Sequence, residues 1–360
     1  MYNSEIHKEH MSYVINLAEK GRGSVSPNPL VGCIIVKDGK IIGEGYHKSF
    51  GENHAEVDAL SNCIEDPIDA DLYVNLEPCS FYGKTPPCVN AIISSSIKNV
   101  FIGTKDPNEK VNGSGIEKLK QAGINVVCSI LEEECINQNI GFFHWIKTGR
   151  PWVVAKVAQT KNGYMGIDSN QSIWLTGEDS MIEVHKLRSK VDGILVGKNT
   201  AKVDNPELTV RKVKGINPTR IIADTYRKLN LNLKLFNDEE SKTIVLCSKD
   251  VFEDSFTTFC QYLPVKLSGK YLDPNDILDV LGNNGITSLM IEGGKKILES
   301  FFNEDLINEI YLFTSNKIID KSTLSNPIKI NEKWQVLDQK DFIDDNLVIA
   351  RKKELCLQES

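Results

Sequence analysis

The chain has 360 residues, of which 41% are hydrophobic and 25% charged, and its formal net charge is −7 at pH 7. This balance argues against a nucleic-acid binder that relies on a broad basic face, and the absence of an 18-residue apolar run argues against a membrane span. The polar beginning gives no reason to expect a signal peptide, and the length predicts two domains.

The first predicted elements are a buried strand and its hairpin partner. Residues 30–36 are continuously apolar and rich in β-branched side chains, and residues 41–46 follow a Lys-Asp-Gly turn. Asn53 is suited to cap the next helix, which would place His54 and Glu56 in its first turn.

A second buried strand is predicted over residues 72–76, just before Cys79. Pro87 suits the first position of the following helix, so Cys88 is expected at another helix start. Thiolates and metal-bound anions are favoured at such helix N-termini.

His54, Cys79 and Cys88 form a ligand set that zinc prefers, and three protein ligands leave the fourth tetrahedral position open to water. Bound zinc lowers the pKa of water from about 15.7 toward ~7, and the resulting hydroxide can attack a ring carbon that bears an amine. We expect Glu56 to carry the proton to the departing nitrogen, as in zinc deaminases generally. The alternative is a closed structural zinc site, for which no fourth Cys or His stands at ligand spacing.

A domain boundary is expected near residues 148–151, after a helix over 132–146 that breaks at Gly141. Beyond it, strand-like runs alternate with amphipathic helical stretches, which predicts a mostly parallel sheet covered on both faces. The predicted strands are 152–158, 193–197, 220–224, 243–247, 287–291 and 309–314, and the clearest helices are 179–190 and 296–302.

Gly293 and Gly294 follow one of these strands and lead into a helix. Such a turn lets backbone N–H groups meet a phosphate, although two glycines after a strand more often form only a tight turn. No G-x-G-x-x-G motif occurs, so a Rossmann dinucleotide fold is not supported.

Eight residues separate Cys79 from Cys88, whereas most zinc deaminases have two. The segment 78–88, together with Pro-Asn-Pro-Leu-Val-Gly at 27–32 and Asp-Pro-Asn at 106–108, closely resembles the first domain of the bifunctional riboflavin-biosynthesis deaminase/reductase family. The resemblance implies a cytidine-deaminase-like three-layer α/β/α domain. It also implies that three residues, each with an ordinary surface or turn role as its alternative, line the pyrimidine and ribose-phosphate pocket: Asn28, His47 and Lys84.

The second half resembles the reductase domain of the same family, which is similar to dihydrofolate reductase and uses NADPH. The matching segments are 156–158, 172–177, 187–188, 199–206 and 208–211. The residues that would contact NADPH are Ala158, Trp174, Thr200, Asp204, Thr225 and Gly294. Those that would hold the substrate are Ser172, Arg188, Leu208, Arg211 and Glu292.

Arg188 and Arg211 suit the substrate phosphate, because guanidinium groups pair bidentately with phosphate oxygens. Lys156 is a candidate donor to the charge that develops when hydride reaches the substrate.

The resemblance thus implies a bifunctional α/β enzyme with a zinc deaminase over residues 1–147 and an NADPH-dependent reductase over 148–360. One zinc ion per chain would serve deamination of a diaminopyrimidinone ribosylamine phosphate, and NADPH would reduce the ribosyl side chain of the aminouracil product. A homo-oligomer, either a dimer or a tetramer, is expected. Cys33, Cys247 and Cys260 lie in apolar strand-like runs, which suggests reduced core thiols and a cytoplasmic protein.

One position departs from the family pattern. The family usually carries Ser-Leu-Asp-Gly after the first reductase strand, whereas this chain has Thr-Lys-Asn-Gly with Asn162 in place of the aspartate. A deaminase with a weakly active or non-catalytic second domain therefore remains an alternative. A nucleic-acid base deaminase is another, although the short cysteine spacing and basic flank expected of one are missing.

Overall fold

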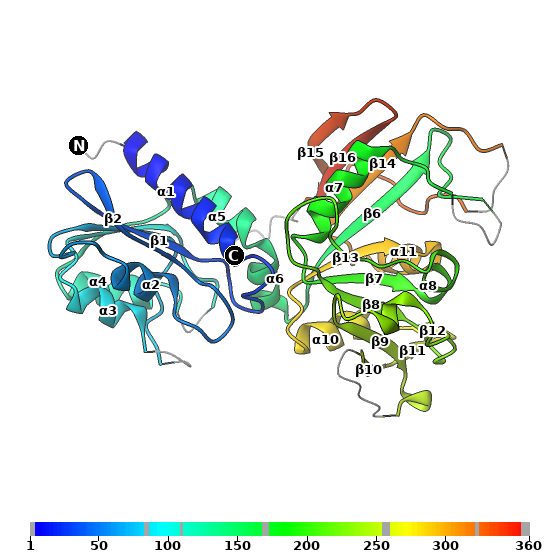
Figure 1. Ribbon diagram of the computed structural model, residues 1–360, viewed down its shortest axis with the longest axis horizontal. Coiled ribbons are helices and arrows are strands. Elements are labelled where there is room, and N and C mark those ends of the chain that lie inside the picture. Colours follow the sequence, from blue (N-terminus) through cyan, green and yellow to red (C-terminus); the bar gives the residue numbers. More distant parts are fainter. Residues whose placement is uncertain are drawn as a thin grey trace. The chain divides into compact units, whose positions relative to one another are not determined.

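The computed structural model describes residues 4–82, 86–108, 111–167, 173–253, 260–320 and 324–353. The chain divides into two compact units, Met1–Gly149 and Arg150–Ser360, and each has its own main sheet (Figure 1). Within these ranges, no helix combines the length and apolar character needed to cross a bilayer.

The first unit alternates helices with short strands. Its helices are α1 (Ser4–Ala18), α2 (Ala55–Ser61), α3 (Cys88–Ser94), α4 (Ser114–Gln121), α5 (Glu132–Gln138) and α6 (Ile140–Thr148), with a 3-10 turn at Glu19–Gly21. Its strands are β1 (Gly32–Lys37), β2 (Lys40–Tyr46), β3 (Asp71–Leu76), β4 (Asn99–Thr104) and β5 (Asn125–Val127).

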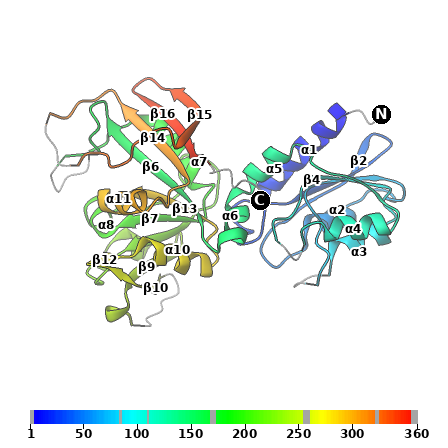
Figure 2. The same cartoon turned by 180° about the vertical axis from the view of Figure 1, so that it is seen from behind.

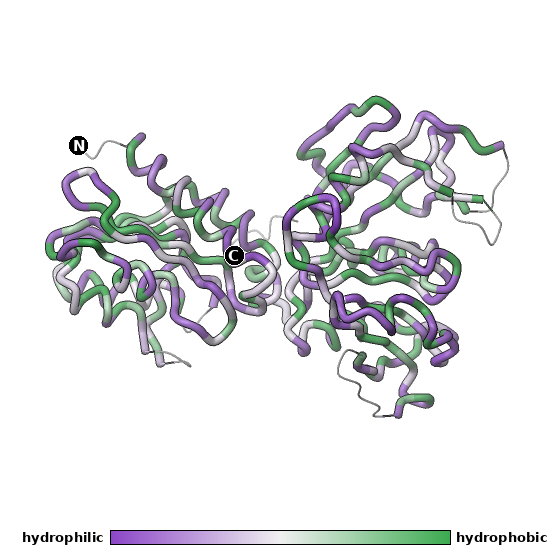
Figure 3. Tube along the Cα trace, viewed as in Figure 1, coloured by the Kyte–Doolittle hydropathy of each residue, from purple (hydrophilic) through white to green (hydrophobic). Residues whose placement is uncertain are grey.

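These strands form one sheet in the order β2-β1-β3-β4-β5, in which β1 runs antiparallel to both neighbours and β3, β4 and β5 are parallel. Alternate strand residues face opposite sides, so one strand supplies two cores. Ile34, Tyr73 and Phe101 pack with α1 and α5, while their strand neighbours pack with α2, α3 and α4. Both ribbon views show the helices divided in this way, which confirms the predicted three-layer α/β/α fold (Figures 1 and 2). Hydrophobic and hydrophilic residues alternate along α1, as a helix with one face on a sheet requires (Figure 3).

Three local predictions for this unit are corrected by the structure. His54, not Asn53, is the N-cap of α2, because its backbone is extended and its carbonyl accepts the Asp58 N–H at 3.0 Å. Pro87 is the N-cap of α3 rather than its first helical residue. The helix predicted over 132–146 breaks at Asn139 instead of Gly141, because the Asn139 amide hydrogen-bonds both the N–H and the carbonyl of Leu30.

The second unit is built on a sheet of nine strands. They are β6 (Trp152–Thr160), β7 (Gly193–Gly197), β8 (Thr219–Ala223), β9 (Thr243–Ser248), β10 (Cys260–Val265), β13 (Ser288–Gly293), β14 (Glu309–Ser315), β15 (Trp334–Asp341) and β16 (Asp345–Lys352). The helices are α7 (Glu178–Arg188), α8 (Lys198–Asp204), α9 (Lys234–Asn237), α10 (Pro274–Asn283) and α11 (Lys295–Asn303). A 3-10 turn at Lys249–Val251 and a small hairpin of β11 (Leu267–Ser268) with β12 (Tyr271–Leu272) complete it.

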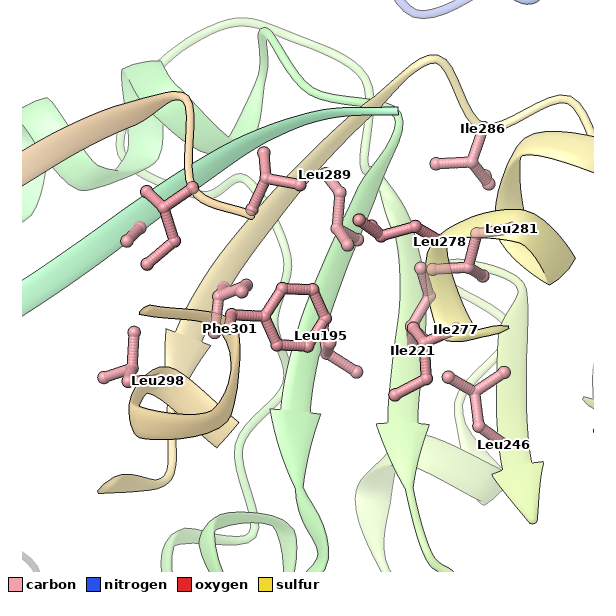
Figure 4. Packing of buried hydrophobic residues seen from close by; sticks show 14 of the residues in the cluster. Leu195, Ile221, Leu246, Ile277, Leu278, Leu281, Ile286, Leu289, Leu298 and Phe301 are labelled. Carbon is pink, nitrogen blue, oxygen red and sulfur yellow. The ribbon is translucent and has the colours of Figure 1, made fainter. Parts of the chain in front are cut away.

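The strand order is β10-β9-β8-β7-β13-β6-β14-β16-β15, and every pair from β10 to β14 is parallel. The prediction of a mostly parallel sheet is therefore confirmed. On one face, buried side chains such as Leu195, Ile221 and Leu289 pack against α10 and α11, including Phe301 (Figure 4). Residues that alternate with this core along the strands, among them Lys156 and Glu292, point to the opposite face.

Candidate functional site

Three segments bring His54, Cys79 and Cys88 together in the first unit. His54 precedes α2, Cys79 follows β3, and Cys88 begins α3. His54 Nδ1 lies 3.2 Å from Cys88 Sγ and 3.5 Å from Cys79 Sγ, and the Cys88 backbone N–H points at Cys79 Sγ at 3.3 Å. Because the extended backbone of His54 directs its ring away from α2, the imidazole meets the two thiols.

This geometry fits a zinc ion. All three ligand atoms lie within 4.8 Å of one another. A tetrahedral ion at about 2.0–2.1 Å from nitrogen and about 2.3 Å from sulfur would separate these atoms by roughly 3.5 Å. Within the described ranges, the cluster contains one histidine and two cysteines and no fourth protein ligand, so a coordination position would stay open.

Glu56 is buried beside these groups in the first turn of α2 and interacts with the Cys88 thiol. Burial raises the pKa of Glu56, and the nearby Cys79 adds to this effect. Hydrogen bonds from Cys88 and His54 hold the pKa of the Cys79 thiol well below its usual range. A carboxyl group with a raised pKa beside a thiolate is suited to accept and return a proton.

Asn28 and His47 lie next to this cluster and are hydrogen-bonded to each other. The amide Nδ2 of Asn28 lies 3.1 Å from His47 Nε2, and His47 Nδ1 lies 3.1 Å from the Asn53 carbonyl oxygen. The ring of His47 meets that of His54 edge-on, with centroids 5.6 Å apart. Both nitrogens of His47 therefore have protein partners, although the resemblance implied a role for this residue in lining the substrate pocket. Lys84, the third residue of that pocket, lies outside the described residues.

Glu77 is a residue whose role the sequence did not reveal, although it belongs to the Glu-Pro-Cys motif. Its buried carboxylate accepts four backbone N–H groups at 2.9–3.3 Å, from Asp106, Gly113, Gly115 and Ile116. The approach is so close that a Cβ on Gly115 would lie 2.2 Å from the Pro78 carbonyl oxygen. Glu77 thus joins the start of α4 to the loop that carries Cys79. Burial raises the pKa of Asp106, which lies between β4 and α4, to about 6.

We expect Glu77→Gln to destabilise the first unit by about 3 kcal/mol or more, because charge-assisted hydrogen bonds are worth about 1.5–3 kcal/mol each and the new amide would face N–H donors. Amide hydrogen exchange at Gly113, Gly115 and Ile116 should accelerate accordingly. Glu117→Gln, on the exposed side of α4, is the matched control. Unchanged exchange at those three amides in the Glu77 variant would contradict this account.

The second unit has a buried charge cluster on the sheet face opposite α10 and α11. Lys156 on β6 and Glu292 on β13 stand side by side because Ala155 pairs with Ile291, and their Nζ and Oε1 atoms are 3.8 Å apart. Arg188, at the end of α7, donates to both oxygens of Glu292 at 2.9 and 2.7 Å. Burial lowers the pKa of Lys156. It also opposes ionisation of Glu292, but Arg188 and Lys156 outweigh that effect and lower the Glu292 pKa.

The guanidinium of Arg188 does not have a free pair of N–H groups with which to bind a phosphate, because Nε and Nη2 donate to Glu292. Its remaining bond, from Nη1, goes to the Thr209 carbonyl at 2.9 Å, so this side chain braces Glu292 and the 207–211 segment. Arg211 is half exposed and pairs with Glu207 at 2.6 Å, and its backbone N–H donates to His185 Nδ1. Leu208 is buried with a positive φ of 54°. Arg211 is therefore the cation of this segment that remains accessible to an anionic ligand.

The strand-end turns after β7 and β13 form a cradle that suits a dinucleotide phosphate. Gly294, with a φ of 96°, begins α11, and a Cβ there would lie 3.5 Å from Thr200 Oγ1 and 3.6 Å from the Gly197 nitrogen. Because Gly293 and Gly294 carry no side chains, backbone N–H groups at the start of α11 are accessible to an anion. Trp174 is 70% exposed, and its carbonyl accepts a bond from Lys317.

The other residues expected at the NADPH site are also located by the structure. Ala158 and Thr225 are partly buried near the ends of their strands, and Asp204 is exposed at the end of α8, close enough to act on Lys156. Ser172 lies outside the described residues. The second unit thus places Lys156 and Glu292 within the sheet and Ala158 and Thr225 near strand ends. Thr200 and Asp204 lie on α8, and Trp174 lies in the segment before α7.

Asn162, the departure from the family pattern, extends the pairing of β6 with β14. Its Nδ2 donates to the Ile319 carbonyl at 2.7 Å, and its Oδ1 accepts the Ile319 N–H at 3.3 Å and the Thr160 hydroxyl at 2.8 Å. An aspartate can accept but not donate, so it would place a carboxylate oxygen against the Ile319 carbonyl. The Asn162 amide therefore uses both its donor and its acceptor to hold this turn together.

Restoring the family residue should weaken the turn. We expect Asn162→Asp to cost about 1 kcal/mol, the typical value of one hydrogen bond, and to accelerate hydrogen exchange of the Ile319 amide. Asn230→Asp is a suitable control, because among the described residues Asn230 uses only its side-chain oxygen, which accepts the Asn232 N–H at 2.9 Å. Equal behaviour of the two variants would show that the Asn162 donor makes no contribution.

Comparisons with known proteins find a matching family for each of the two units. Residues 151–346 match the family described as the RibD C-terminal domain, and residues 4–104 match the cytidine and deoxycytidylate deaminase zinc-binding region. The riboflavin biosynthesis protein RibD of Actinobacillus pleuropneumoniae is 38% identical over 92% of this chain and 89% of its own length. That of Aquifex aeolicus is 38% identical over 97% of this chain and 95% of its own length.

A crystal structure from Thermotoga maritima, described as a diaminohydroxyphosphoribosylaminopyrimidine deaminase/5-amino-6-(5-phosphoribosylamino)uracil reductase, has the same fold as this chain. The TM-score is 0.88 at 34% sequence identity, and the match covers 98% of this chain and 100% of that one. With full-length relatives above 30% identity, the chain belongs to the RibD family of bifunctional riboflavin-biosynthesis enzymes, in which a zinc-dependent deaminase is joined to an NADPH-dependent reductase.

Proposed function

We propose that an N-terminal domain over residues 1–147, within the first unit, deaminates 2,5-diamino-6-(5-phosphoribosylamino)pyrimidin-4(3H)-one at a zinc ion held by His54, Cys79 and Cys88. The observation that carries the proposal is the convergence of these three ligands beside the buried Glu56. When bound, the ion would lower the pKa of water and supply a nucleophile near neutral pH.

The chain's own residues account for proton transfer. Glu56 is the acidic group next to the ligands, and its raised pKa makes its carboxylate a stronger base than an exposed glutamate. It would accept the proton released by the nucleophile and pass it to the nitrogen that departs as ammonia. Lys84 and Asn28 are proposed to hold the substrate beside this group.

We further propose that residues 148–360 reduce the ribosyl side chain of 5-amino-6-(5-phosphoribosylamino)uracil to a ribityl chain. Hydride transfer would place negative charge on the former carbonyl oxygen or imine nitrogen, and Lys156 would stabilise it. Glu292 and Arg188 would orient Lys156, because Arg188 is hydrogen-bonded to Glu292 and Glu292 forms an ion pair with Lys156. The remaining substrate residues are proposed to be Ser172, Leu208 and Arg211.

NADPH would supply the hydride when bound. The cradle at Gly294 and Thr200 supports a site for its phosphates. The other proposed contacts are Ala158, Trp174, Asp204 and Thr225.

Mass spectrometry of the products formed by the purified protein tests both activities. Zinc-loaded protein without NADPH should release ammonia from the diaminopyrimidinone and yield the aminouracil, and addition of NADPH should add two hydrogens. Ammonia release without the second change, and without oxidation of NADPH, would support the alternative in which the second unit is not catalytic. No reaction in either condition would overturn the proposal.

The remaining proposals concern the protein's state in the cell. We propose a cytoplasmic homo-oligomer, a dimer or tetramer, that acts on this small phosphorylated substrate and not on nucleic acid. The net charge of −7 supports the last point. Light scattering on the purified protein and a gel-shift assay with tRNA test these statements separately.

A further inference from the structure

A short segment of the second unit, residues 209–211, is held by side chains from the last turn of α7. The Thr209 carbonyl accepts a bond from Arg188 Nη1 at 2.9 Å, and the Arg211 N–H donates to His185 Nδ1 at 3.0 Å. His185 and Arg188 stand three positions apart, so they project from the same face of the helix. They are buried, with 2% and 9% of their surface exposed. The helix thus offers this segment one acceptor and one donor, as a neighbouring strand would.

The other side of the segment is held as well. Val210, in the middle of the segment, donates its N–H to Asn217 Oδ1 at 2.7 Å. Leu208, just before it, has a φ of 54°, which an L-residue keeps only where its surroundings fix the backbone. The Arg211 guanidinium is half exposed, and its Nη1 donates to Thr209 Oγ1 at 2.7 Å. The direction of the Arg211 side chain therefore depends on the backbone bonds on both sides of the segment.

His185 accepts this bond only as a neutral ring. A backbone N–H always donates, so Nδ1 must have a free lone pair and the ring proton must lie on Nε2. Burial lowers the pKa of His185 to about 4, and the positive charges of Arg188 and Arg211 add to this effect. The ring is therefore neutral near neutral pH. A neutral imidazole is an acceptor that can be buried beside two guanidinium groups without bringing a further positive charge to them.

We propose that His185 is a positioning residue of the reductase, which holds the backbone of Arg211 so that the guanidinium meets the phosphate of the substrate. This inference rests on the proposed reductase function of the second unit. It assigns His185 no contact with the substrate or with NADPH. His185 would therefore affect the affinity for a phosphorylated substrate, but neither hydride transfer nor the affinity for a substrate that lacks the phosphate.

The hydrogen bond between His185 and Arg211 can be tested without turnover. The chain has six histidines, so nitrogen NMR of 15N-histidine-labelled protein can be assigned with a His185→Asn variant. We expect His185 to be neutral, with its proton on Nε2. Hydrogen exchange of the Arg211 amide should accelerate in His185→Leu but not in His185→Asn, because the asparagine Oδ1 takes the place of Nδ1 and can accept the bond. A proton on Nδ1 of His185 would overturn the proposal.

Kinetics with the aminouracil show whether His185 acts through Arg211. We expect His185→Leu to raise the KM for 5-amino-6-(5-phosphoribosylamino)uracil roughly tenfold, since a hydrogen bond to a charged group is worth at least that factor. The kcat and the KM for NADPH should not change, nor should the KM for the same compound without its phosphate. His185→Asn should restore the KM, and in an Arg211→Ala background His185→Leu should have no further effect. Lys186→Leu, at an exposed position of the same helical turn, is the matched control.

An equal rise in KM for the substrate with and without its phosphate, or with and without the Arg211 side chain, would show that His185 acts by another route and would overturn the proposal. If His185→Leu fails to fold, an unrestored KM in His185→Asn would overturn it instead.

Failure of the proposed reductase function is a separate outcome. If the wild-type protein oxidises no NADPH with the aminouracil, that function fails, and NMR titration with ribose 5-phosphate then tests the role of His185. This probe should bind the wild-type and His185→Asn proteins equally, and the His185→Leu and Arg211→Ala proteins more weakly. Equal binding to all four proteins would overturn the proposal.

Discussion

Glu56→Gln should retain zinc and lose deamination by roughly 10²-fold or more in kcat, since general acid–base catalysis typically contributes at least that factor. Glutamine has nearly the same shape as glutamate, so the packing in the first turn of α2 should survive. It cannot accept and return a proton, and this is the property that the site requires of a buried group with a raised pKa. Ammonia release under saturating substrate measures the effect.

The control for this prediction is Glu52→Gln, the same chemical change at an exposed position four residues earlier. Metal analysis of both variants separates loss of the proton carrier from loss of zinc. A Glu56→Gln protein that contains stoichiometric zinc and turns over at the wild-type rate would show that another group carries the proton.

Lys156→Ala should reduce the reductase turnover by about 10²-fold or more, the typical effect of removing one donor that faces developing negative charge. The fold should tolerate the change, because Glu292 keeps its two hydrogen bonds to Arg188. NADPH oxidation with the aminouracil as substrate measures the effect. Deamination by the same preparation reports whether the rest of the protein is intact.

Lys353→Ala, an exposed lysine after β16, provides the matched control. A wild-type rate of reduction in the Lys156 variant would remove this residue from the mechanism. The charge on the reduced atom would then require another donor.

The sequence predicted the zinc centre well because its information is local. His54, Cys79 and Cys88 each stand beside a strand or helix end that hydrophobic periodicity and proline identify. The mostly parallel sheet of the second unit followed from the same periodicity, whereas the three layers of the first unit were expected from the family resemblance. The predictions at Asn53 and Pro87 were wrong by one residue and that at Gly141 by two. In the last case, tertiary hydrogen bonds of Asn139 with Leu30 decide where the helix ends.

The remaining features depend on partners that are far apart in the sequence. Arg188 and Glu292 are 104 residues apart, and no sequence pattern indicates that they pair with each other. This pairing occupies the N–H groups of Arg188 that would otherwise bind a phosphate. The four N–H groups that bind Glu77 come from positions 29 to 39 residues away, and they become donors to one carboxylate only after α4 has packed. The motifs thus identified the chemistry, while pairing within the fold determined which charges are accessible.

The arrangement of Cys79 and Cys88 also has a practical consequence. Their sulfur atoms lie within 4.8 Å of each other, and Cys79 is the more readily ionised of the two. Since thiolates are the reactive form, air oxidation of metal-depleted protein should join this pair preferentially. Stored samples would then need a reductant as well as added metal before they regain ammonia release, and a preparation given metal alone would be misjudged as inactive.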